Sequence, residues 1–417
     1  MSNDIDNDYF CDGITEEIIN ALTAVNQIKV IARTSSFAFK GKDIDIREIG
    51  KQLNVNTILE GSIKKSQERV RITAQLIDVT DGTHYWSKRF DRELIDIFDL
   101  EDEISLAIAD EIRNNFGHFE VKDHLIEQPT NSIDAYQLFL KGRFNQLQWT
   151  PDALKKAIQF YNEAISLDIN YAKAYYGNVQ CYELLTTWGY MDKEEGTEKA
   201  FLNLMKAKEI DTHLPEHPMC YVNKCFWREW DFKSTYHYLN DVLAINPNHT
   251  DALDVMVKLF MAHGYFNEAI FYGKKLLEID PLSANNQYIF ANIHYYKGDF
   301  DIALYHITKA IQLRRDFDLA YHKKAVCLIA LNKREQLENE FQSNPLWEKI
   351  QLLHEAVNEN RKSLPKEVLS SFLSNHLKRD QLTLFELFIL ANTNYKEEAY
   401  ELLKQFVAQK RGQILNY

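Results

Sequence analysis

The sequence predicts an α+β domain at the N-terminal end, followed by an all-α superhelical solenoid. Residues 69–79 nearly alternate apolar and polar side chains and lie between short turns, which is typical of an antiparallel strand with one buried face. Further along the chain, small side chains recur at a step of 34 residues, at Thr235, Ala269 and Ala303. A step of this length indicates helix–turn–helix units that bury their apolar faces only by stacking on one another.

Composition is consistent with this architecture and excludes some functions. The chain has 417 residues, which predicts two or three domains, and its 14 Gly and 8 Pro are few enough to favour long helices. The net charge is −13, and no basic face is evident. We therefore expect no direct binding of nucleic acid, since that requires cationic side chains against the phosphate backbone.

Cysteine content and hydropathy bear on the compartment. Five cysteines, an odd and scattered set, indicate reduced thiols rather than a disulfide framework. No apolar run is long enough to cross a bilayer, so the chain predicts no transmembrane segment, and its acidic start lacks a signal-peptide core. Taken as given, the chain is expected in the cytoplasm. It is expected in the periplasm if a membrane span precedes it in a longer parent protein.

The first 116 residues predict a small sandwich of helices on a meander. Apolar residues at helical spacing follow Asp12 or Thr15, either of which could cap the helix, and a β-prone run comes next. The expected helices span residues 12–24, 45–53 and 96–112, and the expected strands span residues 28–32, 57–65, 69–79 and 84–89.

These segments carry a family resemblance. The motifs are YFCDGITEE (9–17), VIARTS (30–35), IREIG (46–50), LEGS (59–62), RITAQL (71–76) and WSKRFDR (86–92), followed by the helix at 98–104. In this order, over residues 4–115, they resemble the TolB-like N-terminal domain family. The resemblance implies that tetratricopeptide repeats follow. It also implies that an output module precedes: a helix-turn-helix DNA-binding domain, a nucleotide cyclase or a kinase, often with a membrane span between.

The start of the chain departs from that family. Its members open with an apolar strand before an Asn-rich segment, whereas this chain begins inside the Asn/Asp segment. We therefore expect that Met1 is an internal methionine and that the chain is the C-terminal part of a longer protein. A sheet without its first strand has an unpaired edge, which would favour pairing with another chain and hence an oligomer.

The second half divides by its repeats. We place a polar linker at residues 117–131, tetratricopeptide (TPR) repeats at 132–343, and degenerate helical repeats with a capping helix at 344–417. The expected hairpins pair residues 135–147 with 151–167, 172–185 with 196–210, 220–227 with 232–245, the two halves of 250–280, and the two halves of 284–313, before a further helix at 319–331.

The repeat register predicts a binding groove. In such arrays, positions 2, 5, 9 and 12 of each first helix line the groove, and here they hold amides and tyrosines that could clamp an extended peptide. The alternative is that they are ordinary solvated or packing residues. With no run of Lys or Arg, capture of a C-terminal carboxylate is not expected. The groove residues are Asp251, Asp254, Lys258 and Met261; Asn285, Tyr288, Asn292 and Tyr295; and Leu319, His322, Val326 and Ile329.

Candidates for chemistry are weak. A metal-like spacing joins His213, His217, Cys220 and Cys225, but prolines interrupt it and the cysteines fall on different faces of one helix. The acidic pair at 16–17 and the acidic run at 101–103 could suggest acid/base catalysis. Both lie near helix starts, where carboxylates are favoured electrostatically without any catalytic role. No phosphate-binding glycine loop or nucleophile motif is present. We therefore predict no catalytic residue, no metal and no cofactor.

These observations predict a non-catalytic protein–protein interaction module of a bacterial signalling or transcription-regulatory protein, with a peptide or protein partner in its groove. Two alternatives stay open. The chain could be the regulatory C-terminal part of a nucleotide cyclase or kinase whose catalytic domain lies upstream. It could also be a free-standing oligomeric scaffold.

Overall fold

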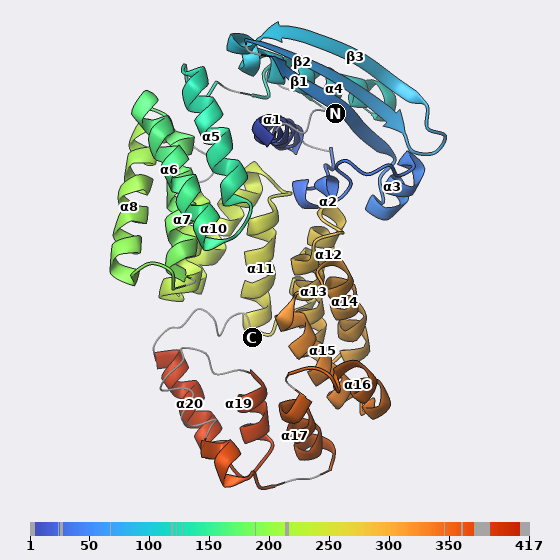
Figure 1. The fold of residues 1–417 in the computed structure, drawn as a ribbon, viewed down its shortest axis with the longest axis vertical. Coiled ribbons are helices and arrows are strands. Elements are labelled where there is room, and N and C mark those ends of the chain that lie inside the picture. The colour runs from blue at the N-terminus through green and yellow to red at the C-terminus, as the bar shows by residue number, and fades with distance from the viewer. Residues whose placement is uncertain are drawn as a thin grey trace. The chain divides into compact units, whose positions relative to one another are not determined.

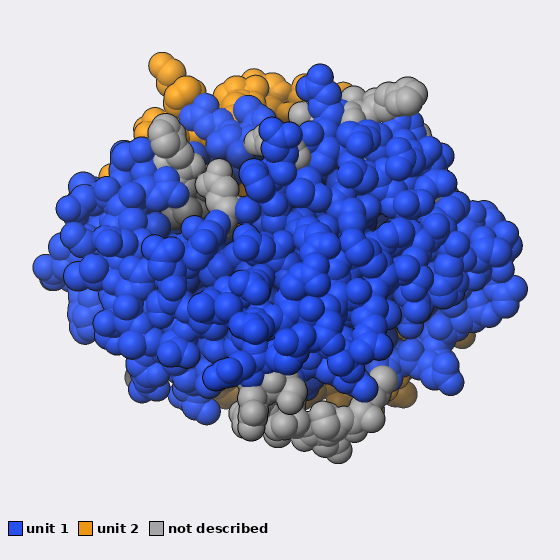
Figure 2. Space-filling model, turned by 90° about the horizontal axis from the view of Figure 1, so that it is seen from above, with its two compact units in different colours: residues 1–221, 241–248 blue, residues 222–240, 249–417 orange. Residues whose placement is uncertain are grey.

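The computed structural model describes residues 5–408 apart from 24, 26–27, 67, 118–119, 122, 127, 188, 213–216, 346, 360–361 and 371–383. The chain forms two compact units, coloured separately in Figure 2. Unit 1 holds residues 1–221 and 241–248, and unit 2 holds residues 222–240 and 249–417. None of the helices in the described ranges combines the length and apolarity needed to span a bilayer.

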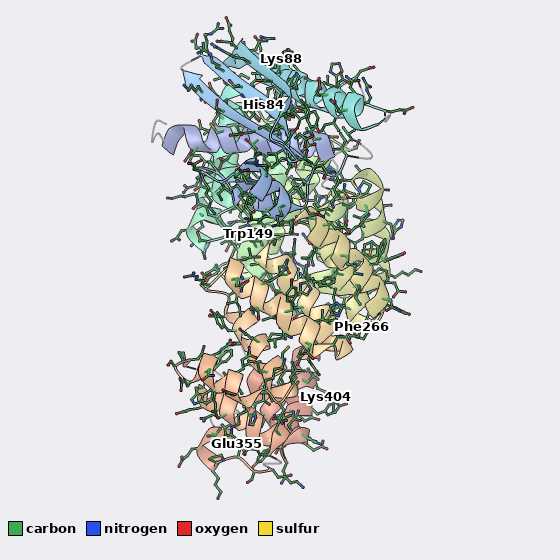
Figure 3. The ribbon with its side chains drawn as sticks, turned by 90° about the vertical axis from the view of Figure 1, so that its right-hand side faces the viewer. His84, Lys88, Trp149, Phe266, Glu355 and Lys404 are labelled. Atoms are coloured by element: carbon green, nitrogen blue, oxygen red, sulfur yellow. The ribbon has the colours of Figure 1, made fainter. Side chains whose placement is uncertain are left out.

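Unit 1 contains a three-stranded antiparallel sheet in the order β1-β2-β3 (Figure 1). The strands are β1 Thr57–Ser66, β2 Arg69–Asp78 and β3 His84–Glu93, and Ile72 of the central strand pairs with Ile63 and Phe90. Alternate residues of β2 are buried, as the sequence pattern predicts. Charged side chains of β3 such as Lys88 lie outside the core (Figure 3).

Two helices cover the buried face of the sheet. α1 spans Ile5–Thr23 and α4 spans Ile97–Phe116, after the short 3-10 turn Leu94–Asp96; Ile14 and Ile104 from these two helices are fully buried in the same core. The shorter α2 and α3 span Arg33–Phe37 and Ile46–Leu53. The Asp45 carboxylate caps α3 by accepting a hydrogen bond from the Arg47 amide at 2.8 Å.

Two predictions for the N-terminal segment are wrong. α1 begins at Ile5 rather than near Asp12, and Gly13 lies inside it. A methyl group at Gly13 would come within 2.6 Å of the Leu140 side chain, so this glycine serves close packing of α1 rather than a helix start. The β-prone run from Ile28 forms no strand. Ile28 and Ile31 bury their side chains in the core instead.

Apart from the third, the predicted helical hairpins occur to within a few residues, and the first helix of each packs on its second. In the described part of residues 344–417, three further helices follow α16, and the prediction of degenerate repeats with a capping helix there stays a prediction. The helices are α5 Ile133–Gln146, α6 Pro151–Leu167, α7 Ala172–Thr187, α8 Lys193–Ile210, α9 His217–Asn223, α10 Phe232–Ile245, α11 Thr250–Ala262, α12 Phe266–Ile279, α13 Ala284–Lys297, α14 Phe300–Leu313, α15 Asp318–Ala330, α16 Arg334–Phe341, α17 Trp347–Asn358, α19 Leu384–Ala391 and α20 Lys396–Ala408.

Small residues let the helices of a hairpin approach closely. The Tyr161 ring is fully buried between two glycines, and a methyl group at either Gly142 or Gly177 would lie 2.5 Å from a ring atom. The Tyr161 hydroxyl donates a hydrogen bond to Gln146 at 2.5 Å, which fixes the ring. In unit 2, Ala269 and Ala303 on the second helices α12 and α14 are small residues that are fully buried.

The third hairpin departs from the prediction of one helix over residues 220–227. α9 ends at Asn223 and continues as a π-helix over Lys224–Glu229, which Trp230 closes with a φ of 56°. Cys225 and Phe226, within this π-helix, are both buried. The prediction relied on regular α-helical periodicity, from which a π-helix departs.

The core of unit 1 does not stop where the helical hairpins begin. One apolar cluster includes Phe10, Ile72 and Ile104 as well as Leu140 and Leu185. Part of the expected linker is held against α4, because the Asp102 carboxylate accepts hydrogen bonds from the amides of residues 125 and 126 at 2.7 and 2.9 Å. The predicted domain boundaries, from 1–116 to 344–417, stay predictions.

Candidate functional site

The predicted groove residues come from the first helices α11, α13 and α15 of unit 2. On α11, the Lys258 ammonium pairs with the Asp254 carboxylate at 2.8 Å and lies 5.1 Å from the centre of the Trp227 ring. The second oxygen of Asp254, Oδ1, is buried and has no hydrogen-bond partner among the described residues. Burial raises the pKa of this carboxyl despite the ammonium beside it. Asp251, one turn earlier, is exposed.

On α13 the predicted residues separate into inner and outer ones. Tyr288 is buried with its ring 5.0 Å from that of Phe317, so it belongs to the packing of α13 against the start of α15. Asn292 is only 5% exposed, and its Oδ1 atom finds no partner in the described part of the chain. Tyr295 is half-buried, and Asn285 is exposed in the first turn. Burial raises the pKa of the Tyr295 hydroxyl.

On α15 the sequence register selects His322, and the structure adds its neighbour Lys323. His322 is half-buried, and burial lowers its pKa. Lys323 is 2% exposed, and its ammonium lies 4.2 Å from the centre of the Tyr295 ring and 4.9 Å from that of Tyr296. Its Nζ atom has no hydrogen-bond partner within the described ranges. Burial lowers its pKa to about 8.

Sequence reasoning missed Lys323 because the register used positions 2, 5, 9 and 12 only. One signal was available in the sequence: Lys323 lies on a predicted helix near the small or apolar residues Ala320, Ala325 and Cys327. The structure buries all three of these residues fully. Three successive first helices thus each hold a buried polar atom that has no partner among the residues the structure describes. We call Asp254, Asn292, Tyr295 and Lys323 the first-helix set.

The acidic residues of unit 1 form structural ion pairs. Glu16 on α1 is buried and accepts two hydrogen bonds from the Arg143 guanidinium of α5, at 3.0 and 2.8 Å. Glu17 pairs with Lys173 of α7 at 3.3 Å. These pairs tie α1 to the first two hairpins, and they give the acidic pair a role in holding helices together.

Glu101 on α4 is fully enclosed. Its Oε1 atom accepts a hydrogen bond from the Tyr136 hydroxyl of α5 at 2.7 Å, and its Oε2 atom is buried without a partner in the described part of the chain. Burial, helped by the nearby Glu17 carboxylate, raises the pKa of Glu101 well above its ordinary value. The neighbouring Asp102 holds the linker, as described above, so these two acids also have structural partners.

The metal-like spacing does not assemble a ligand set in the described residues. The His217 ring donates from Nε2 to the Asp211 carbonyl oxygen at 2.6 Å, and Cys220 and Cys225 are buried thiols. His213 lies outside the described residues. No group of three or more His, Cys, Asp or Glu side chains with metal-binding geometry occurs in the described ranges.

Comparison with known proteins places the repeats. A family model described as "Anaphase-promoting complex, cyclosome, subunit 3" matches residues 262–342, which contain α12 to α16. Together with the 34-residue step and the stacked hairpins, this match shows that the repeats are of the TPR type, a solenoid fold typically used for protein–protein interaction. The solved TPR protein YrrB, described as having "an unusual peptide-binding site", is 25% identical, with a TM-score of 0.29, and covers 46% of this chain and 92% of its own.

Two relatives have regulatory names. "Putative adenylate cyclase 3" of Rhizobium meliloti (strain 1021) is 38% identical over 175 residues, which are 42% of this chain and 30% of the relative. "Transcriptional regulator HilA" of Salmonella paratyphi A (strain ATCC 9150 / SARB42) is 30% identical over 86 residues, 21% of this chain and 16% of the relative. The chain therefore spans less than a third of either relative.

Proposed function

We propose that the chain is a non-catalytic interaction module that binds an extended segment of a partner protein along the first helices α11, α13 and α15. The observation that carries this proposal is the first-helix set. Each of these helices buries one polar atom that lacks a partner within the described ranges, and an unpaired buried polar group costs stability. A peptide backbone carries donors and acceptors at regular spacing, so a bound segment would satisfy such atoms.

We further propose that residues 1–116 form a TolB-like domain and that the whole chain is the regulatory part of a bacterial signalling or transcription-regulatory protein. The resemblance of the motifs at 9–17 and 71–76 supports the first statement. The names of the two relatives support the second. The shared core and the Glu16–Arg143 pair would couple α1 to the first repeats, so that an event in the repeats could reach the sheet.

A phage-displayed library of random peptides, selected on the whole chain, tests this proposal. We expect selected peptides to bind in calorimetry, and we expect Asn292→Leu and Tyr295→Ala to weaken binding at least tenfold, or about 1.4 kcal/mol. Tyr305→Ala is the matched control, because Tyr305 is an exposed tyrosine on the second helix α14. Peptides that bind all three variants as they bind wild type would place their site elsewhere and refute the proposal.

A second candidate follows from the cyclase relative. The chain could serve as the regulatory part of a nucleotide cyclase, with catalysis in another domain, since 175 of its residues are 38% identical to a protein of that name. The test is to co-express the chain with the cyclase domain encoded in the same gene and to measure the rate of cyclic-nucleotide formation with and without a selected peptide. This candidate predicts that the peptide changes the rate. An unchanged rate in the presence of a selected peptide would argue against this candidate.

A further inference from the structure

Lys323 stands out among the lysines of unit 2. Lys258 and Lys324 are also partly or largely buried, but each has a carboxylate partner, Asp254 at 2.8 Å and Glu340 at 2.5 Å. Lys323 is more deeply buried than Lys258, yet among the described residues its ammonium has no hydrogen-bond partner and lies over the faces of Tyr295 and Tyr296. A buried ammonium normally has both an opposite charge and hydrogen-bond acceptors.

Tyrosine faces do not replace these partners. The ring quadrupole attracts a cation but accepts none of its three N–H donors. At neutral pH the amine is nevertheless mainly protonated, because its pKa of about 8 is still above 7. The free protein therefore holds a cation that lacks a counter-ion in the described part of the chain.

We infer that Lys323, between Tyr295 and Tyr296, is an anion subsite that takes an acidic side chain, Asp or Glu, of the bound partner segment. This inference rests on the proposed function and names the chemistry of its partner. A carboxylate would supply both the missing charge and the missing acceptors, since charge-assisted hydrogen bonds are the strong ones. The chain itself provides no such group to Lys323 within the described ranges.

The surroundings fit an extended segment with an acid at one fixed position. Asn292 lies one helical turn before Tyr296 on α13, and its free Oδ1 atom is a ready acceptor for a backbone N–H of the same segment. Tyr296, whose ring centre lies 4.9 Å from the ammonium, is 37% exposed, and we expect rotation of this ring to admit the incoming side chain. The acid would then be read by Lys323 and the backbone by Asn292.

The sequences of the phage-selected peptides test the inference. We expect Asp or Glu at one fixed position, and we expect selection on Lys323→Met to lose that preference. In a selected peptide, replacing the acid by its amide should weaken binding to wild type at least tenfold and leave binding to Lys323→Met nearly unchanged. Lys309→Met is the control, because Lys309 also lies over a tyrosine, Tyr305, but on α14. It should behave as wild type.

The outcomes separate the two proposals. Selected peptides without an acidic position, or an equal loss on amide replacement in wild type and Lys323→Met, would overturn the anion subsite and leave the peptide-binding function standing. Failure to select any peptide would overturn both. Lys323→Gln provides a second uncharged variant should Lys323→Met not fold.

Discussion

Replacing Lys323 by methionine should stabilise unit 2. The pKa of Lys323 is about 8 rather than 10.5. A difference of one in pKa corresponds to about 1.4 kcal/mol, so keeping the amine charged in the folded chain at neutral pH costs about 3 kcal/mol. Methionine keeps the straight apolar stem without the charge, and we therefore predict that Lys323→Met raises the free energy of unfolding by about 2–3 kcal/mol.

The pH dependence of this gain has a definite sign. Between pH 8 and about 10.5 the unfolded chain holds a proton on Lys323 that the folded chain has released, so wild-type stability rises with pH there. The advantage of Lys323→Met should then shrink towards zero at about pH 10. Hydrogen exchange in increasing urea, read on peptides from α13 and α15, measures unit 2 alone. Two results would refute this reasoning: Lys323→Met less stable than wild type at neutral pH, or the same difference in the free energy of unfolding at neutral pH and at about pH 10.

Three further predictions concern unit 1, each followed by urea unfolding of the whole chain. Gly142→Ala should destabilise by about 1–3 kcal/mol, because its methyl group would lie 2.5 Å from the fixed Tyr161 ring; no change would mean that the ring has room to move. Arg143→Met should lower the free energy of unfolding by about 3 kcal/mol, because among the described residues the buried Glu16 would keep just its weaker 3.5 Å contact to Arg33 of α2. A loss below about 1 kcal/mol would mean that the Glu16–Arg143 pair contributes no more than an exposed ion pair. The free energy of unfolding of wild type should fall as pH rises through the raised pKa of Glu101, whereas that of Glu101→Gln should stay constant over the same range. Equal pH dependence of wild type and Glu101→Gln would contradict a raised pKa for this carboxyl.

Much of the fold follows from local patterns that need no knowledge of tertiary contacts. The alternation over β2 predicts its buried face, and Asp45 marks the start of α3 as a capping residue should. The 34-residue step locates the hairpins from α11 to α14, because each unit repeats the same small residues at the same helix crossings.

The errors arise where distant packing decides local structure. A glycine such as Gly13 often marks a helix boundary, but Gly13 lies inside α1, where it packs closely against the Leu140 side chain. The π turn at 224–229 departs from the single α-helical period on which the prediction relied. For the candidate site, the register finds Asp254, Asn292 and Tyr295. It misses Lys323, which is singled out by an ammonium without a hydrogen-bond partner among the described residues.

Site-specific photocrosslinking to a selected peptide tests the central claim most directly. The photoreactive residue p-benzoylphenylalanine would replace Tyr295 on the first helix α13 or, as a control, Tyr305 on the second helix α14 of the same hairpin. Our account predicts that the peptide crosslinks to the chain altered at position 295 and not to the chain altered at position 305. A crosslink at position 305 alone would contradict binding along the first helices.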